Sequence, residues 1–93
     1  MMLDLEVARQ ALKFLKRMQP KHQKQVKTKI GALQLNPFPH DSIQLQNYAP
    51  YRRATCGEYR IVYRVDDEGK ILIVSIIAKR NDDQVYKLLN RLQ

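Results

Sequence analysis

A nearly unbroken apolar run late in the chain limits the possible folds more than any other feature. It lies within Lys70–Ala78, and Ser75 is the only polar residue after the first position. Both faces of such a strand must be covered, which is typical of an interior strand of a sheet. We therefore expect Lys70–Ala78 to be a strand with a neighbour on each edge, preceded by a turn at residues 66–69.

The segment before this turn predicts a hairpin over Tyr51–Val65, with its turn at residues 56–58. Side chains alternate between two faces along a strand. One face of the second strand carries Tyr59, Ile61, Tyr63 and Val65, and the other carries Arg60, Val62 and Arg64. If the loop holds an even number of residues, Arg53 and Thr55 share the face of Arg60. Two arginines close together repel each other unless an anion lies between them, so this face is predicted to bind an anion.

The first part of the chain predicts a short strand and two helices. Leu3–Val7 alternates apolar and acidic residues, which is typical of a half-buried strand. From about Ala8 the apolar period becomes helical, and Pro20 ends this helix and begins another. The expected buried stripes are Ala8, Ala11, Leu12, Leu15 and Met18 in the first helix, and Val26, Ile30 and Leu33 in the second.

The remaining segments connect these elements and close the structure. Residues 36–42 contain two prolines and predict a loop, which we expect Ile43, Leu45 and Tyr48 to anchor. A final amphipathic helix, capped by Asn81, is expected to bury Val85, Leu88, Leu89 and Leu92. The predicted order is β-α-α-β-β-β-α in a single α+β domain over residues 1–93, with a mainly antiparallel sheet. A basic helical hairpin covers one face of this sheet and leaves the arginine face relatively open.

Positive charge is concentrated in the first two thirds of the chain. The net charge is +8, and Asp41 is the only acidic residue between Val7 and Gly57. This asymmetry predicts a surface that binds a polyanion. A solvated, lysine-rich helix surface gives the same pattern, so charge alone does not separate the two explanations.

The composition also disfavours several classes of protein. No apolar run reaches the ~18 residues that span a bilayer, and we expect no signal peptide at the start of the chain. The single cysteine, Cys56, fits a reducing cytosol. His22, His40 and Cys56 do not form a zinc-type ligand set, so we expect neither a metal nor another cofactor.

Three segments together carry a resemblance to a known family. They are Gly57–Tyr63, which runs Gly-acid-Tyr-Arg-apolar-apolar-Tyr, the strand end Ala78–Arg80, and Tyr86 in the last helix. The leading strand and the basic helical hairpin agree with the same family in order and length. With these features the chain resembles the RelE/ParE superfamily of bacterial toxins, and in particular its RelE branch.

The resemblance implies the toxin of a type II toxin–antitoxin pair. It implies a cytoplasmic, metal-independent endoribonuclease that cleaves mRNA in the ribosomal A site and inhibits translation. The implied partners are a cognate antitoxin, mRNA and ribosomal RNA, with no membrane. The implied catalytic residues are Arg60, Arg80 and Tyr86, and the implied RNA-binding residues are Arg53, Arg52 and Lys79. Thr55 stands where the family often has a second basic residue, so Arg52 or Lys79 would have to compensate.

The chemistry of metal-free RNA cleavage suits these residue types. The 2′-hydroxyl must lose a proton, a five-coordinate phosphorane must be stabilised, and the leaving 5′-oxygen must be protonated. Arginine suits the second task because its planar cation holds phosphate oxygens in bidentate fashion. Its pKa above ~12 makes it a poor base. The base can therefore be Tyr86, Glu58, or a group of the substrate or ribosome.

Each of these residues also has an ordinary structural explanation. Arg60 can pair with Glu58, Arg80 can pair with Asp82 or Asp83, and Tyr86 can be a half-buried packing residue because it lies off the apolar stripe of its helix. His40 has no partner that would make it a general acid, His22 lies among lysines, and Cys56 is better explained as an incidental turn residue than as a nucleophile.

Two other functions compete with the nuclease. A ParE-like inhibitor of DNA gyrase shares the hairpin block but performs no cleavage, and Arg80 together with Tyr86 favours the nuclease over it. A degenerate toxin that only binds RNA is the second alternative, and the presence of Thr55 in place of a basic residue supports it.

Overall fold

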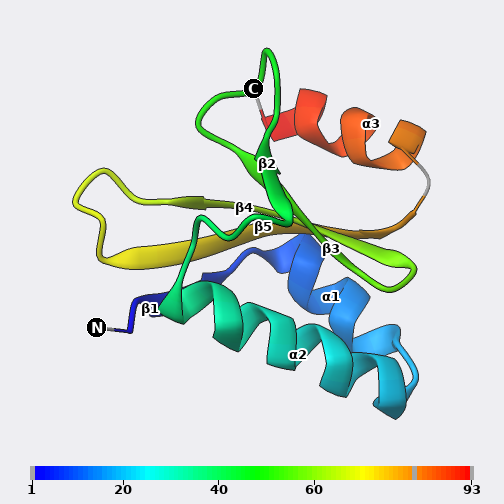
Figure 1. Cartoon of the computed structure of the whole chain (residues 1–93). Coiled ribbons are helices and arrows are strands. Elements are labelled where there is room, and N and C mark those ends of the chain that lie inside the picture. Colours follow the sequence, from blue (N-terminus) through cyan, green and yellow to red (C-terminus); the bar gives the residue numbers. More distant parts are fainter. Residues whose placement is uncertain (1, 81, 93) are drawn as a thin grey trace.

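The chain folds into a five-stranded sheet with helices on both of its faces (Figure 1). The computed structural model describes residues 2–80 and 82–92. The elements follow in the order β1 (Asp4–Val7), α1 (Arg9–Arg17), α2 (Pro20–Leu35), β2 (Ser42–Gln44), β3 (Arg52–Cys56), β4 (Tyr59–Val65), β5 (Ile71–Lys79) and α3 (Asp82–Leu92). Among the described residues, none of these helices is long and apolar enough to cross a membrane.

The sheet has the strand order β1-β5-β4-β3-β2. β5 lies between β1 and β4, as the apolar run predicts, and most of its side chains are buried. β1 runs parallel to β5, whereas every other neighbouring pair is antiparallel. The expected α+β fold with a mainly antiparallel sheet is therefore confirmed.

The α1–α2 hairpin covers one face of the sheet and forms the larger core. Its buried side chains come from both helices and from the central strands: Ala11, Leu15, Met18, Val26, Ile30, Leu33, Ala54, Tyr59, Ile61, Tyr63, Leu72, Val74 and Ile77. The predicted stripes are confirmed except at Ala8, which is half-buried and precedes α1, and at Leu12, which is 40% exposed. Phe14 packs against the core instead, because the stripe of α1 that faces the sheet is centred on Ala11 and Leu15.

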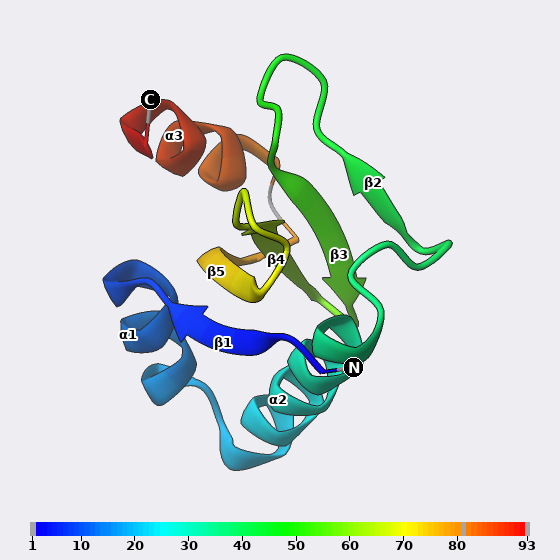
Figure 2. The ribbon, with the colours of Figure 1, turned by 90° about the vertical axis from the view of Figure 1, so that its left-hand side faces the viewer.

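The opposite face is covered by α3, so the expectation that the arginine face stays open is wrong. Val85 and Leu89 of α3 pack on Val62 and Ile76, and Leu45 joins them from the segment after β2. Figures 1 and 2 show α3 on the side of the sheet opposite α1 and α2, beside the loop between β2 and β3. The final helix is amphipathic as predicted, although Leu92 is 46% exposed. The predicted cap, Asn81, lies outside the described residues.

The short strand β2 is absent from the sequence prediction. It pairs with β3 through Ser42↔Ala54, Ile43↔Arg53 and Gln44↔Arg52. Three residues at the edge of a sheet are too few to show a period of two, and the preceding prolines indicate only a loop. The expected anchor Leu45 is buried and Tyr48 is half-buried, but Ile43 is 48% exposed and does not anchor the loop.

Candidate functional site

The register of the β3–β4 hairpin gathers the predicted anion-binding residues on one face. Cys56 pairs with Tyr59 across a two-residue loop, in which Gly57 has a φ of 58°. A glycine with positive φ at the first loop position is typical of a tight hairpin turn. Thr55 therefore pairs with Arg60, and the next residue pair on the same face contains Arg53. The predicted sharing of a face by Arg53, Thr55 and Arg60 is confirmed.

Arg53 and Arg60 are diagonal neighbours on this face, and both are half-buried. Diagonal neighbours in adjacent antiparallel strands lie about 7–8 Å apart, which is close enough for two long side chains to reach one anion. Nε of Arg53 is buried and has no hydrogen-bond acceptor among the described residues. A buried donor of this kind is stabilised by an acceptor that a bound ligand supplies.

Arg52 is held on the other face, away from Arg60. It pairs with Tyr63, whose side chain lies in the core beneath α1 and α2. Its guanidinium donates hydrogen bonds to Ser42, at 2.8 Å to Oγ and 3.2 Å to the carbonyl oxygen, and lies 5.1 Å from the ring centroid of Phe38. The structure thus places this predicted RNA-binding residue in contacts that fix the loop before β2.

The end of β5 connects Arg80 to the hairpin turn. The backbone N–H of Arg80 donates a hydrogen bond of 2.7 Å to the carbonyl oxygen of Glu58. Ala78, two residues earlier, is the strand partner of Arg60. Arg80 therefore lies just past the Arg60–Ala78 pair along the chain. Lys79 pairs with Tyr59 and therefore faces the helical hairpin, on the side opposite Arg60. Both Lys79 and Arg80 are exposed.

Tyr86 lies on α3, the helix that covers the arginine face. It is 39% exposed, and its ring packs against Tyr48 with the centroids 5.8 Å apart. The Tyr48 hydroxyl donates a hydrogen bond of 3.0 Å to Oδ1 of Asn90, one turn further along α3. Tyr86 thus packs against the β2–β3 loop through one side of its ring and remains accessible elsewhere. The role of Tyr48 as its neighbour was not predicted from the sequence.

The other titratable candidates are His22, His40 and Cys56. Nδ1 of His22 lies 2.8 Å from the Tyr59 hydroxyl, and His40 is exposed. Burial raises the pKa of the Cys56 thiol, and the nearby charge of Lys29 opposes this only in part. A protonated thiol is a poor nucleophile. Within the described residues no group of three or more His, Cys, Asp or Glu side chains could hold a metal ion.

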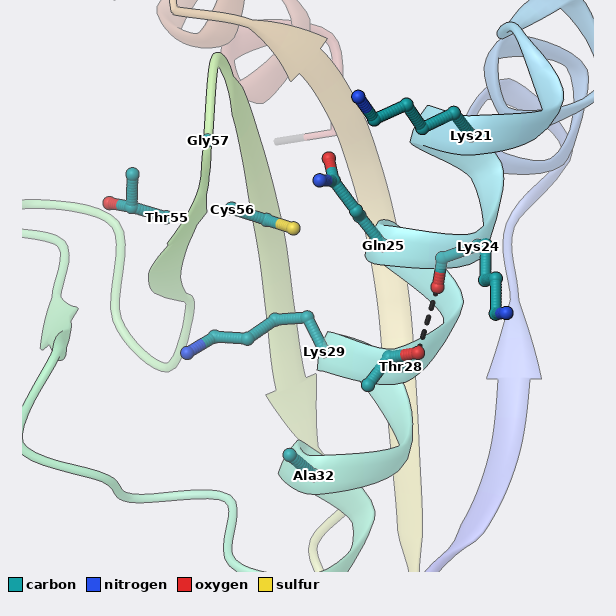
Figure 3. Close-up of a pocket in the computed structure, with 9 residues that line it drawn as sticks. All are labelled: Lys21, Lys24, Gln25, Thr28, Lys29, Ala32, Thr55, Cys56 and Gly57. Carbon is teal, nitrogen blue, oxygen red and sulfur yellow. Dashed lines mark hydrogen bonds between the residues drawn. The ribbon is translucent and has the colours of Figure 1, made fainter.

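A further groove lies elsewhere, between α2 and the end of β3 (Figure 3). Its volume is about 620 Å³, and Lys21, Lys24 and Lys29 lie along it. Figure 3 shows Cys56 pointing toward α2, whereas Thr55 points away from the helix. Because Arg60 shares its face with Thr55, this groove does not contain the candidate catalytic residues. The helical spacing of Lys21, Lys24 and Thr28 could have predicted that these side chains share one face of α2 and line a common surface.

The α2 lysines that line this groove differ in their contacts. Nζ of Lys29 forms a salt bridge of 2.5 Å with a carboxylate oxygen of Asp41. The hydrogen bond from Lys29 holds the pKa of Asp41 below its usual range. Lys21 and Lys24 are exposed, and within the described part of the chain neither forms a salt bridge. Much of the positive charge of this helix is therefore available to a polyanion.

The fold and the hairpin arginines define a small basic α+β domain with a candidate anion-binding face, and comparison with known proteins identifies its family. The model of the family described as the ParE toxin of the type II toxin–antitoxin system parDE matches residues 5–83. The chain therefore belongs to this family, within the RelE/ParE superfamily.

Relatives outside the family model agree with this assignment. A Methanocaldococcus jannaschii protein assigned as toxin RelE1 is 29% identical over 83 residues, which cover 86% of this chain and 92% of the relative. A substituted E. coli RelE toxin in the free state has a TM-score of 0.81 at 22% identity, covering 98% of this chain and 97% of that one. RelE from the RelE–RelB complex of Pyrococcus horikoshii OT3 has a TM-score of 0.75 at 23% identity, covering 87% of this chain and 98% of that chain. The likeness to these structures establishes the fold. The chain is thus a RelE-like toxin of the type II toxin–antitoxin class.

Proposed function

We propose that this toxin is a metal-independent endoribonuclease that cleaves mRNA in the ribosomal A site and so inhibits translation. The observation that carries the proposal is the position of Arg53 and Arg60 as diagonal neighbours on one face of the hairpin, with Arg80 joined to the same turn by its backbone. The buried Nε of Arg53, which has no acceptor among the described residues, supports an anionic ligand on this face.

In this reaction Arg60 and Arg80 hold the scissile phosphate. The 2′-oxygen of one nucleotide attacks the adjacent phosphorus, the bond to the 5′-oxygen of the next nucleotide breaks, and a 2′,3′-cyclic phosphate and a free 5′-hydroxyl result. Negative charge builds on the equatorial oxygens of the phosphorane, where planar arginine donors are most effective. Arg53 contacts the same or a neighbouring phosphate as an auxiliary cation.

Tyr86 serves this reaction either as the base for the 2′-hydroxyl or as a platform on which a nucleobase stacks. Its partial exposure on the helix over the arginine face is compatible with both roles. Packing against Tyr48 fixes the orientation of its ring, which favours stacking. Glu58 is exposed in the turn, so a carboxylate base and a base supplied by the substrate or ribosome remain alternatives.

The proposed partners follow from charge and from the relatives. The net charge of +8 favours ribosomal RNA as a docking surface, and that contact should weaken steeply as salt rises. RelE proteins of Pyrococcus horikoshii, E. coli and Methanococcus jannaschii have been solved with RelB antitoxins. We propose that this toxin likewise has a cognate antitoxin, acidic enough to neutralise its basic surface.

Induced expression and a reconstituted translation reaction test the proposal. Wild-type protein should arrest growth and cleave a translated mRNA, with cut sites mapped by primer extension. Arg80→Ala and Tyr86→Phe should relieve growth arrest, and Arg80→Ala should lower the cleavage rate about 10²–10³-fold. Both variants should unfold at nearly the wild-type temperature, because both side chains are substantially exposed.

Two controls separate the competing functions. Omission of ribosomes should abolish or strongly reduce cleavage, whereas undiminished cleavage of free RNA would contradict action in the A site. Full toxicity of Arg80→Ala would remove Arg80 from the mechanism, and full toxicity of Tyr86→Phe would exclude the Tyr86 hydroxyl as the base while leaving the stacking role of its ring. Inhibition of DNA gyrase supercoiling by the purified toxin, without mRNA cleavage, would replace the nuclease with a gyrase inhibitor.

A further inference from the structure

A cleft on the helical side of the sheet lies apart from the candidate catalytic arginines. It lies between the α1–α2 corner and the tip of the β3–β4 hairpin, and its volume is about 450 Å³. Sites that bind small molecules have volumes of roughly 300–1,000 Å³. The lining residues that matter for its chemistry are Phe14, Arg17, His22, Glu58, Tyr59 and Lys79.

Three rings form the aromatic part of this cleft. Phe14 meets Tyr59 edge-on, with centroids 6.1 Å apart and an angle of 74° between the rings. The His22 ring lies 5.4 Å from Tyr59, and its Nδ1 is within hydrogen-bond distance of the Tyr59 hydroxyl. Tyr59 is buried, whereas Phe14 and His22 are half-buried and present part of each ring to solvent. Partly exposed rings that are fixed by such contacts are good platforms for a stacked nucleobase.

The charged residues of the cleft are two cations and one carboxylate. Arg17 on α1 and Lys79 at the end of β5 are exposed, and neither forms a salt bridge within the part of the chain that the structure describes. Both are available to a phosphate group. Glu58 repels a phosphate but accepts hydrogen bonds from the N–H groups of a base edge. Rings, cations and an acceptor together fit a nucleotide better than they fit a simple anion.

The cleft adjoins the candidate catalytic face around the end of β5. Lys79 pairs with Tyr59 and faces the cleft, whereas the next residue, Arg80, is bonded through its backbone to Glu58. Arg60 lies on the opposite face of the same hairpin. An RNA strand that crosses the end of β5 can therefore meet cations on both sides of the sheet.

We propose that the cleft formed by Arg17, His22 and Lys79 binds one nucleotide of the substrate RNA beside the scissile phosphate. The inference rests on the proposed function, because it takes the arginine face as the place of cleavage. The base stacks on the exposed parts of His22 and Phe14, and a phosphate of the same strand contacts Arg17 and Lys79. The cleft then fixes the position of the strand, and its Arg17, His22 and Lys79 do not take part in bond breaking.

Binding of synthetic oligonucleotides to the full chain tests this inference. Both a dinucleotide and a hexanucleotide carry 2′-fluoro groups, so that neither can be cleaved, and their Kd values are measured by fluorescence anisotropy at one fixed salt concentration. The Kd of the dinucleotide divided by the Kd of the hexanucleotide reports what nucleotides beyond the first phosphate contribute to binding. Arg17→Gln and Lys79→Gln should each reduce this ratio about tenfold. His22→Gln, which removes the ring but keeps a polar group toward Tyr59, should also reduce it.

Lys27→Gln is the matched control, because it removes one charge from an exposed position of α2 outside the cleft. It should leave the ratio within about twofold of wild type. Equal effects of the three charge removals would mean that RNA meets a diffuse basic surface, and would overturn the cleft site. An unchanged ratio in His22→Gln would overturn the stacked base. Cleavage of translated mRNA is measured separately, so failure of the nuclease and failure of the cleft give different results.

Discussion

The two faces of the sheet differ in the size of their hydrophobic core and in the side chains that lie on them. Among the described residues, the face under α1 and α2 carries the larger core, and the strand side chains buried in that core are apolar or aromatic. The face under α3 carries a smaller core centred on Val62, and arginines lie beside it. Half-buried arginines contribute little to folding and are suited to holding an anion. The comparison indicates that the first face stabilises the fold, and under the proposed function the second face holds the RNA phosphate.

The sharpest test of this division compares two equally buried leucines, one from each side. Leu33 on α2 and Leu89 on α3 are 1% and 0% exposed. Leu33→Ala should lower the free energy of unfolding by about 2–5 kcal/mol, a large part of the roughly 5–15 kcal/mol of a typical domain. Leu89→Ala should lower it less, because a terminal helix can detach locally, yet it should impair cleavage. Urea denaturation together with a cleavage assay measures both.

An equal and fully cooperative loss of stability in the two variants would contradict this division. It would mean that α3 is as much a part of the folding core as the α1–α2 hairpin.

Two adjacent arginines provide the next test, because they lie on opposite faces. Arg52 is bonded to Ser42, so Arg52→Met should destabilise the protein by about 1–2 kcal/mol and change cleavage little. Arg53 has a buried donor without an acceptor among the described residues, so Arg53→Met should leave stability unchanged or raise it by up to about 1 kcal/mol. The same change should weaken RNA binding. Thermal unfolding and RNA titration of both variants would show this contrast, and the reverse order would refute it.

A smaller effect is expected where the α1–α2 hairpin contacts the β3–β4 hairpin. Tyr59→Phe removes only the hydroxyl that lies 2.8 Å from Nδ1 of His22. The loss of this hydrogen bond should reduce stability by about 1 kcal/mol, with the aromatic packing kept. Denaturant titration measures the change. A loss of several kcal/mol would instead make this contact a principal element of the fold.

The smallest effect concerns the reactivity of the helical face. Because burial raises the pKa of the Cys56 thiol, the thiolate fraction at neutral pH should be lower than that of free cysteine. Alkylation of Cys56 by iodoacetamide should therefore be slower than that of free cysteine at neutral pH and should accelerate as the pH rises. Rapid alkylation at pH 7 would show that this side of the sheet carries a reactive group.

Local patterns in the sequence were sufficient to predict the hairpin and its faces. Alternation along Tyr59–Val65 identifies which side chains share a face, and a short loop fixes the register that brings Arg53 and Arg60 together. The apolar run in β5 correctly predicts an interior strand. These features depend on neighbours in sequence, so they can be inferred without knowledge of the tertiary structure.

Features that depend on packing between distant segments were not predicted. The position of α3 over Val62 is decided by contacts across the chain, and without it the arginine face was expected to be open. Strand β2 exists because Ser42–Gln44 meets β3, not because of its own pattern. Lys79 was expected to compensate for Thr55, and its pairing with Tyr59 turns it to the face opposite Arg60. A contact between Tyr48 and Tyr86 likewise requires the folded loop.

The most direct test of catalysis by the arginine face is the cleavage rate of Arg60→Lys beside that of Arg64→Lys. Both residues lie on β4, four positions apart and therefore on the same face. Both substitutions keep the positive charge. Lysine cannot reproduce the bidentate geometry of arginine. We predict a loss of about 10²-fold in the rate of mRNA cleavage on programmed ribosomes for Arg60→Lys, and less than about threefold for Arg64→Lys. Wild-type cleavage by Arg60→Lys would contradict the central role assigned to this face.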